Sequence, residues 1–377
     1  MNCFFARPAC RMVFGAGIAV LSLAAAYADE EKGPFIPRII LSSTIPANGD
    51  LNPYGLAFVP DGFASGGTIA PGDVLVSNFN DFNNCQGKGT TIIKLTPNSA
   101  VAPAVPVGSS GNAITFFAGK EPGLTLALGV LRRGFVIVGN VLTTDCMSDT
   151  VAGGKLQVVD RNGKLVAALT DRTFFDSPWG LTVHDLGDTA QIFVANVLSG
   201  NVSRLDVAVT ALNIVLKRAT VIATNYTHRT DPAALVLGPT GLLYDAEADV
   251  LYVASTADNA IFKVPHAGKA TFPVNKGTVV FADANVLRGP LGLAFTPSGN
   301  LITSNGDAVN PDPTHPSEVI EFTPSGKFVR QYNIDAGADG AFQIATVLRP
   351  GARFNFAAVN DNNNSVAVYA LPRHDDE

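Results

Sequence analysis

Short apolar runs alternate with turn residues along most of the chain, and this pattern predicts strands rather than helices. Val, Ile, Thr, Phe and Gly are abundant, whereas the helix formers Lys, Glu and Met are scarce. The sequence therefore predicts an all-β protein.

One pattern recurs six times. Each unit opens with a Pro-x-Gly-like turn and a short apolar strand, and a second apolar strand follows that usually ends in Asn. The openings begin at Pro53, Pro122, Pro178, Pro239, Pro290 and, in degenerate form, Ala341. The second strands end at Asn78, Asn140, Asn196, Ser255, Asn305 and Asn360. Intervals of 50–62 residues between these ends suit four short strands with their loops, so we predict a six-bladed β-propeller.

The repeats place the propeller at residues 29–372. The sixth unit is one outer strand short, while residues 36–43 resemble a strand that has no blade of its own. We therefore expect this N-terminal strand to complete the last blade, which would close the ring and leave no open edge. The predicted blades are residues 45–119, 120–170, 171–226, 227–284, 285–335 and 336–371 together with strand 36–43.

The first 28 residues have the features of a secretory signal. Arg7 and Arg11 precede an apolar stretch, and Ala26-Tyr27-Ala28 forms a small-x-small cleavage site. We therefore expect a secreted or periplasmic protein with no membrane span in its mature part. The polar tail, residues 373–377, is expected to be disordered. The formal charge of −6 disfavours a nucleic-acid partner, and we expect a monomer.

Residues 238–264 carry the clearest family resemblance. The segments Gly-Pro-Thr-Gly-Leu-Leu-Tyr-Asp, Val-Leu-Tyr-Val-Ala-Ser-Thr-Ala-Asp-Asn and Ala-Ile-Phe-Lys-Val look like an NHL-type repeat. The chain is also similar to the SMP-30/gluconolactonase-like and paraoxonase-like six-bladed propellers. The resemblance implies the fold more strongly than the activity, because this superfold hosts lactonases, lyases and binding modules alike.

Two cysteines remain in the predicted mature chain, Cys85 and Cys146. Each follows the second strand of its blade, in the first and second units, so the two loops should be neighbours on one face. Because an exported protein meets an oxidising compartment, we predict a disulfide between them. Two free thiols, or a metal held by both cysteines, are the alternatives.

The same face collects the asparagines that end the second strands, and we predict Asn78, Asn140, Asn196, Asn305 and Asn360 as ligand-binding residues. Their oxygens suit Ca²⁺ or another divalent cation such as Mg²⁺, with Asn140, Asn196, Asn305 and Asp307 as candidate ligands. The alternative is that Asn recurs because each blade needs the same turn. The resembling lactonases use a glutamate that has no evident counterpart here. Tyr54 and Trp179, at equivalent openings, would form a pocket floor or pack between blades.

These features leave three functional hypotheses. The first is a propeller that binds a small molecule or a protein across this face, because no serine-hydrolase, zincin or P-loop motif is present. The second is a metal-dependent hydrolase of the lactonase or esterase type, with Asp81, Asp145, Asp307 and Asp361 as its carboxylates. The third is a lyase that uses His228 as its base.

Overall fold

Strands account for nearly all of the regular structure. The computed structural model describes residues 36, 38–97, 105–107, 111–306, 308–312, 314, 317–337, 340–347 and 356–369. Within these ranges it contains 27 strands and two short 3-10 turns, η1 (Ser148–Thr150) and η2 (Asp361–Asn363). The predicted signal, residues 1–28, and the predicted tail, residues 373–377, lie outside the described residues and stay predictions.

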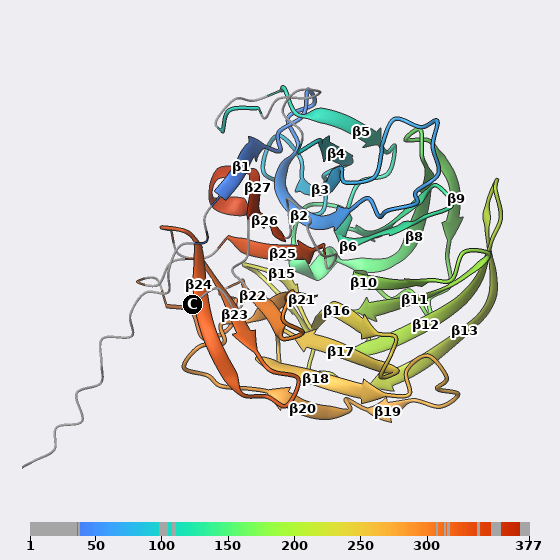
Figure 1. Ribbon diagram of the computed structural model, residues 1–377. Coiled ribbons are helices and arrows are strands. Elements are labelled where there is room, and N and C mark those ends of the chain that lie inside the picture. Colours follow the sequence, from blue (N-terminus) through green and yellow to red (C-terminus); the bar gives the residue numbers. More distant parts are fainter. Residues whose placement is uncertain are drawn as a thin grey trace, which may run out of the picture. The chain divides into compact units, whose positions relative to one another are not determined.

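Apart from one two-stranded hairpin, the described strands form six sheets, each built mainly from consecutive strands, within residues 32–377 (Figure 1). The first blade contains β2 (Leu51–Phe58), β3 (Val74–Asn80), β4 (Thr91–Leu95) and β5 (Ile114–Ala118). The second contains β6 (Leu124–Leu131), β7 (Phe135–Leu142), β8 (Ala152–Asp160) and β9 (Leu165–Leu169). The third contains β10 (Pro178–Asp185), β11 (Thr189–Asn196), β12 (Asn201–Val209) and β13 (Ile214–Thr224), with β19 (Val274–Asn275) added in parallel.

The remaining blades follow the same order. The fourth contains β16 (Pro239–Asp245), β17 (Val250–Ser255), β18 (Ala260–Pro265) and β20 (Thr278–Phe281). The fifth contains β21 (Pro290–Phe295), β22 (Leu301–Asn305), β23 (Ser317–Phe322) and β24 (Phe328–Asp335). The sixth contains β25 (Ala341–Thr346), β26 (Phe356–Asn360), β27 (Ser365–Tyr369) and the N-terminal strand β1 (Arg38–Ser43). A separate hairpin, β14 (Arg229–Asp231) and β15 (Leu235–Leu237), lies between the third and fourth blades in sequence.

The first strands of the blades form the inner ring. Each one contacts the first strand of the next blade, and β25 of the sixth contacts β2 of the first. Glycine at the third position of the openings permits this approach. A Cβ at Gly180 would lie 1.9 Å from the carbonyl oxygen of Thr240, and one at Gly241 would lie 2.0 Å from that of Leu291. The Pro-x-Gly repeat therefore reflects close backbone packing between blades.

Apolar side chains fill the six junctions between blades. Each junction has a buried cluster of its own, and both faces of the inner strands contribute to such clusters, so β6, for example, is buried along its whole length. This explains why the inner strands are continuous apolar runs without polar alternation. A seventh cluster, which includes Tyr54, Phe79 and Trp179, occupies one end of the channel.

The N-terminal strand closes the ring, as the sequence predicts. β1 pairs antiparallel with β27, with Ile40 opposite Val368 and Ser43 opposite Ser365. Just beyond it, the backbone amide and the hydroxyl of Thr44 both donate to the carbonyl oxygen of Asn364, at 2.9 Å each. The predicted all-β, six-bladed propeller with an N-terminal closing strand is confirmed. No helix among the described residues is long and apolar enough to cross a membrane.

Candidate functional site

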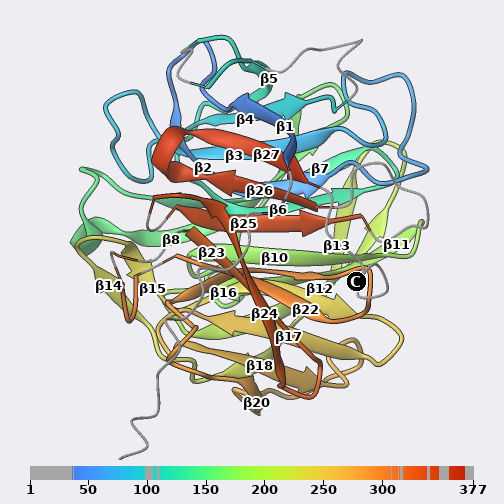
Figure 2. The same cartoon turned by 60° about the vertical axis from the view of Figure 1, so that its left-hand side comes forward.

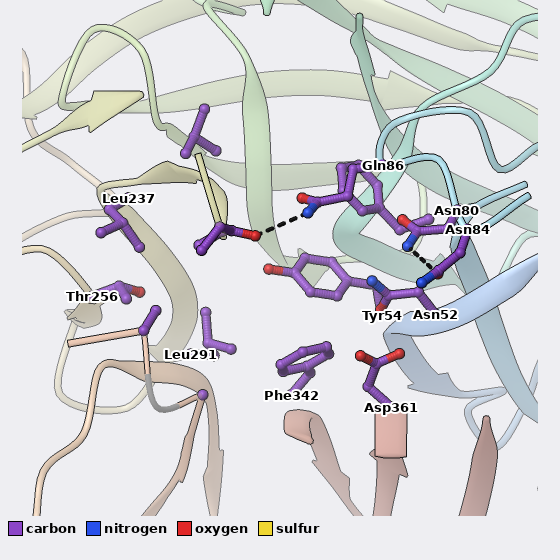
Figure 3. A pocket seen from close by; sticks show the side chains of 16 residues that line it. Asn52, Tyr54, Asn80, Asn84, Gln86, Leu237, Thr256, Leu291, Phe342 and Asp361 are labelled. Carbon is purple, nitrogen blue, oxygen red and sulfur yellow. Dashed lines mark hydrogen bonds between the residues drawn. The ribbon is translucent and has the colours of Figure 1, made fainter. Parts of the chain in front are cut away.

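A cavity of about 300 Å³ lies where the inner strands begin, at one end of the channel. Figure 3 shows its wall. The side chains come from the first, fourth, fifth and sixth blades, from the loop after β3, and from the β14–β15 hairpin. The lining residues are Asn52, Tyr54, Phe79, Asn80, Asn84, Gln86, Ala233, Ala234, Val236, Leu237, Thr256, Leu291, Gly306, Ala308, Phe342 and Asp361.

The register of the blades explains which residues form the floor. In five of the six blades the opening residue pairs with the Asn or Ser near the end of the second strand, for example Pro53 with Asn78 and Ala341 with Asn360, and in the second blade Leu124 makes this pair with Asn140. The next residue in sequence then lies at the channel, and across the six blades this position is Tyr54, Thr125, Trp179, Thr240, Leu291 and Phe342.

Three aromatic rings from these positions meet beneath the cavity. The ring centroids of Tyr54 lie 5.7 Å from Trp179 and 5.0 Å from Phe342, both edge-on, which is a favourable aromatic geometry. Trp179 also donates from Nε1 to the hydroxyl of Tyr54, at 3.2 Å. Trp179 is 1% exposed and does not line the cavity, whereas Tyr54 does. Trp179 thus supports Tyr54 from below.

Amide side chains form the polar part of the wall. Asn80 is 3% exposed, and its Nδ2 donates to Oδ1 of Asn84 at 2.8 Å. Oδ1 of Asn80 and Oδ1 of Asn52 are buried and have no hydrogen-bond partner among the described residues. A buried acceptor left unpaired costs about 1–3 kcal/mol, so each of these two oxygens carries an energetic penalty in this arrangement.

The β14–β15 hairpin covers the cavity from the side of the third and fourth blades. Figure 2 shows it projecting from the ring. In its turn, Oδ1 of Asp231 accepts from the backbone amides of Ala233 and Ala234, at 3.0 Å each. Gln86 donates from Nε2 to the carbonyl oxygen of Ala233, at 2.9 Å, which joins the turn to the loop after β3 (Figure 3).

Leu235 follows this turn with a left-handed φ of 63°, which is unusual for a leucine. Its side chain is 1% exposed and belongs to the same cluster as Trp179 and Val197. A backbone of this kind costs roughly 1–3 kcal/mol and persists only where the surroundings impose it. Burial of Leu235 among the channel residues, together with the hydrogen bond from Gln86 to Ala233, holds the hairpin in place over the cavity.

A disulfide joins Cys85 and Cys146, as the sequence predicts. The two loops that it connects also share polar contacts, because Lys88 donates from Nζ to the carbonyl oxygen of Thr143 at 2.7 Å and Thr143 donates to that of Gln86 at 3.2 Å. The loop that carries Cys146 includes η1, which contacts β14 of the hairpin. The disulfide therefore fixes the rim on which the hairpin rests. Such a bond is typical of an oxidising compartment.

The five predicted asparagines are all buried, and each has a hydrogen-bond partner in the protein. Nδ2 of Asn78 donates to the carbonyl oxygen of Thr44, at 3.0 Å. Oδ1 of Asn196 accepts from the amide of Asp176, at 3.1 Å, and Oδ1 of Asn305 from that of Arg288, at 3.0 Å. The other two donate from Nδ2: Asn140 to the carbonyl oxygen of Pro122, and Asn360 to Oδ2 of Asp335.

These contacts tie the end of each second strand to neighbouring backbone or side chains, which is what repeated turn chemistry requires. None of the five asparagines lines the cavity. A ligand or metal role for them stays a prediction. Asp307, the fourth residue of the predicted metal set, lies outside the described residues.

The other predicted catalytic residues are dispersed. Oδ1 of Asp81 accepts from the amides of Asn83 and Cys85, at 2.9 and 3.0 Å, and so shapes its loop. A hydrogen bond from Thr150 and then one from the Met147 amide lower the pKa of Asp145. Asp361 alone of the described aspartates in this set lines the cavity. His228 is exposed, with Nδ1 2.9 Å from the carbonyl oxygen of Tyr226.

Among the described residues, no three His, Cys, Asp or Glu side chains come together in a way that could hold a metal ion. This search leaves out Asp307 and does not count amide oxygens. The hydrolase and lyase hypotheses accordingly stay predictions, since the described geometry neither assembles their residues nor includes all of them.

Sequence reasoning missed most of the cavity wall. Phe342 and Leu291 occupy the same repeat position as Tyr54, so the alignment of the openings contained the signal for both. Asn80 was also within reach, because it lies two residues after Asn78 and pairs with Leu51. The hairpin residues had no signal of this kind, since residues 229–237 have no counterpart in the other repeats.

Comparison with known proteins adds the following. No family model matches the chain, and no curated protein matches it. Many solved structures resemble it, and three of them are 12–14% identical to it. Inactive H270A virginiamycin B lyase from Staphylococcus aureus, solved with quinupristin, is 14% identical with a TM-score of 0.47, and the match covers 89% of each chain.

The other two structures are similarly distant. The Cps50 (Swd1) β-propeller domain from Myceliophteria thermophila is 12% identical with a TM-score of 0.49, covering 85% of this chain and 98% of that one. The calcium-binding protein regucalcin from Agrobacterium tumefaciens is 12% identical with a TM-score of 0.49, covering 90% and 95%. Such distances carry no argument about activity, so the site itself must supply the functional conclusion.

Proposed function

We propose that this propeller binds a small molecule in the cavity at the channel end, beneath the β14–β15 hairpin. The observation that carries the proposal is a concave cavity of about 300 Å³ whose wall includes the amide side chains of Asn52, Asn80 and Asn84. Elsewhere on the wall, aromatic and aliphatic side chains supply an apolar surface.

The composition of the wall supports a binding site. Ligand pockets are concave and mostly apolar, with a few placed polar groups, and they begin at a volume of about 300 Å³. The floor is rigid because Tyr54 packs against Trp179 and Phe342. The cover is fixed by Gln86 and by the disulfide rim. A preformed site of this kind loses little entropy when its ligand binds.

The test is a fragment screen on the oxidised protein by ligand-observed NMR, repeated on Ala308→Trp. Ala308 lines the cavity and is partly exposed, so an indole there fills the space without disturbing the buried core. Ala248→Trp is the matched control, because Ala248 is exposed in the turn between β16 and β17, at the other end of its blade.

We expect fragments that bind the wild type and Ala248→Trp but not Ala308→Trp. If no fragment binds, or if Ala308→Trp binds the same fragments with unchanged affinity, the cavity is not the binding site and the proposal fails.

A further inference from the structure

The outermost strand of every blade carries one residue more than its neighbour can pair. In the second blade, Val158 of β8 pairs with Ala167 of β9. The next residue, Val159, pairs with Leu165, which leaves Val166 without a counterpart in β8. This is a β-bulge, in which two residues of one strand lie opposite one residue of the other. The outermost strands β5, β9, β13, β20, β24 and β1 all contain such an extra residue.

The ladder between the second and third strands of the blades is regular by contrast. β3 with β4, β11 with β12, β17 with β18, β22 with β23 and β26 with β27 pair residue by residue. β7 with β8 leaves this register only past Asn140, next to the loop. The first strands shift register at the opening turns, where they approach the next blade. Elsewhere in the six blades, the bulges lie in the outermost strands.

Three of these outermost strands have no charged side chain. β5 reads Ile-Thr-Phe-Phe-Ala, β9 reads Leu-Val-Ala-Ala-Leu and β20 reads Thr-Val-Val-Phe. Each lies at the end of its sheet, on the outside of the ring (Figure 1). Each also exposes a large apolar side chain, because Ile114 is 44% exposed, Leu165 42% and Val279 52%. A regular edge strand of this composition would readily pair with a strand of another molecule.

The other long edges have a second protection. β13 contains Lys217 and Arg218, and β24 contains Arg330. Charged side chains on an edge strand oppose its pairing with another chain, since the charges would have to leave water or meet their like. In β5, β9 and β20 no charge does this, so the bulge is the feature that separates them from an open, regular edge.

We propose that the bulges of β5, β9 and β20 keep this propeller from assembling edge to edge with further copies of itself. A bulge bends its strand and increases the local twist, so a strand from another copy cannot follow the edge. These three strands are five, five and four residues long, and each is interrupted within that length. None of the three strands lines the cavity, so the inference is independent of the proposed function.

The extra residues also pack toward the junctions between blades, and a packing role is the alternative. Phe116, the extra residue of β5, is 7% exposed and belongs to a junction cluster, so its loss would remove core contacts. Val166 of β9 and Val280 of β20 are only partly buried at the margins of their clusters. These two positions therefore allow the bulge to be removed with little loss of packing.

The experiment deletes Val166, which leaves Leu165 opposite Val159 and Ala167 opposite Val158 in a regular ladder. Size-exclusion chromatography with multi-angle light scattering follows the mass from micromolar to millimolar protein, and circular dichroism follows the fold. We expect the wild type to stay a monomer and the deletion variant to form dimers and larger species as its concentration rises.

Two control variants separate the bulge from packing. Val166→Ala shortens the side chain but keeps the extra residue, so it should stay a monomer with a slightly lower Tm. Ala168 is exposed in the same strand. Adding Ala168→Lys to the deletion should restore the monomer, because the lysine charge then protects the straightened edge.

Each other result overturns the proposal. A deletion variant that has a lower Tm but remains a monomer would show that the bulge serves packing alone. A wild type that is itself a dimer or larger would contradict the proposal whatever the variants do. If the Val166 deletion does not fold, deletion of Val280 repeats the test in β20. If neither deletion variant folds, the bulges are required for folding itself and the proposal fails.

Discussion

The Cys85–Cys146 disulfide should contribute measurably to the stability of the whole propeller. It closes a loop of 61 residues in sequence. In the chain-entropy treatment, a crosslink of this span stabilises the folded state by about 4 kcal/mol, because it removes conformations from the unfolded chain. The unfolding entropy of a domain of about 350 residues is roughly 0.7 kcal/mol/K, so this free energy corresponds to a Tm about 6 °C higher.

The assay is differential scanning fluorimetry of the wild type and of the double variant Cys85→Ser/Cys146→Ser, each with and without reductant. Reductant should lower the Tm of the wild type to that of the double variant and leave the double variant unchanged. The folded rim should survive, because the contacts of Lys88 and Thr143 remain. A wild-type shift below about 1 °C, or an equal shift in the double variant, would refute the argument from loop entropy.

Two further predictions concern the closing strand and the buried tyrosines. Removal of residues 29–44 should lower the free energy of unfolding by at least about 3 kcal/mol, because the burial of Ile36 and the β1–β27 hydrogen bonds are lost. It should also increase light scattering, because the edge of β27 becomes exposed. A peptide of residues 36–44 should reverse both changes, and an unchanged Tm would contradict the prediction. Burial, followed by the hydrogen bond to Asp249, raises the pKa of Tyr244 to about 12. Because the unfolded tyrosine ionises near pH 10, its contribution is complete below that pH and is lost as the pH rises through 12. Urea unfolding between pH 9 and 12 should therefore show a shallower decline for Tyr244→Phe than for the wild type, and identical slopes would count against it.

The repeated units made the fold predictable from sequence. Asn recurs near the end of the second strand at a regular spacing, for example at Asn78 and Asn140, and the unpaired strand at residues 36–43 indicated how the ring closes. The second blade shows where the sequence pattern misleads. There Leu124, rather than Pro122, pairs with the end of the second strand, and Gly123 has a φ of 97° with the carbonyl oxygen of Val141 close to where a Cβ would be.

The cavity was much less predictable. The asparagines that recur most regularly bond to neighbouring protein groups, as Asn78 does to Thr44 and Asn360 to Asp335. The polar wall is made instead by Asn52 and Asn80, where β2 and β3 extend past the common register. Asn52 has a φ of 58°, a left-handed backbone that no repeat pattern reveals. The cover depends on an insertion between blades, and its position is set by the burial of Leu235.

The pairing of β1 with β27 also means that the ring can close only when both ends of the described chain are present. These strands are among the first and the last parts of the described chain to be synthesised, and the hydrogen bond from Thr44 to Asn364 spans 320 residues. Five blades can therefore assemble from local contacts while the ring stays an open arc. Closure awaits the final strand, and because it joins such distant segments it should be the slow, rate-limiting event. Until then β27 lacks its partner strand, and a chaperone acting on this protein would shield that open edge.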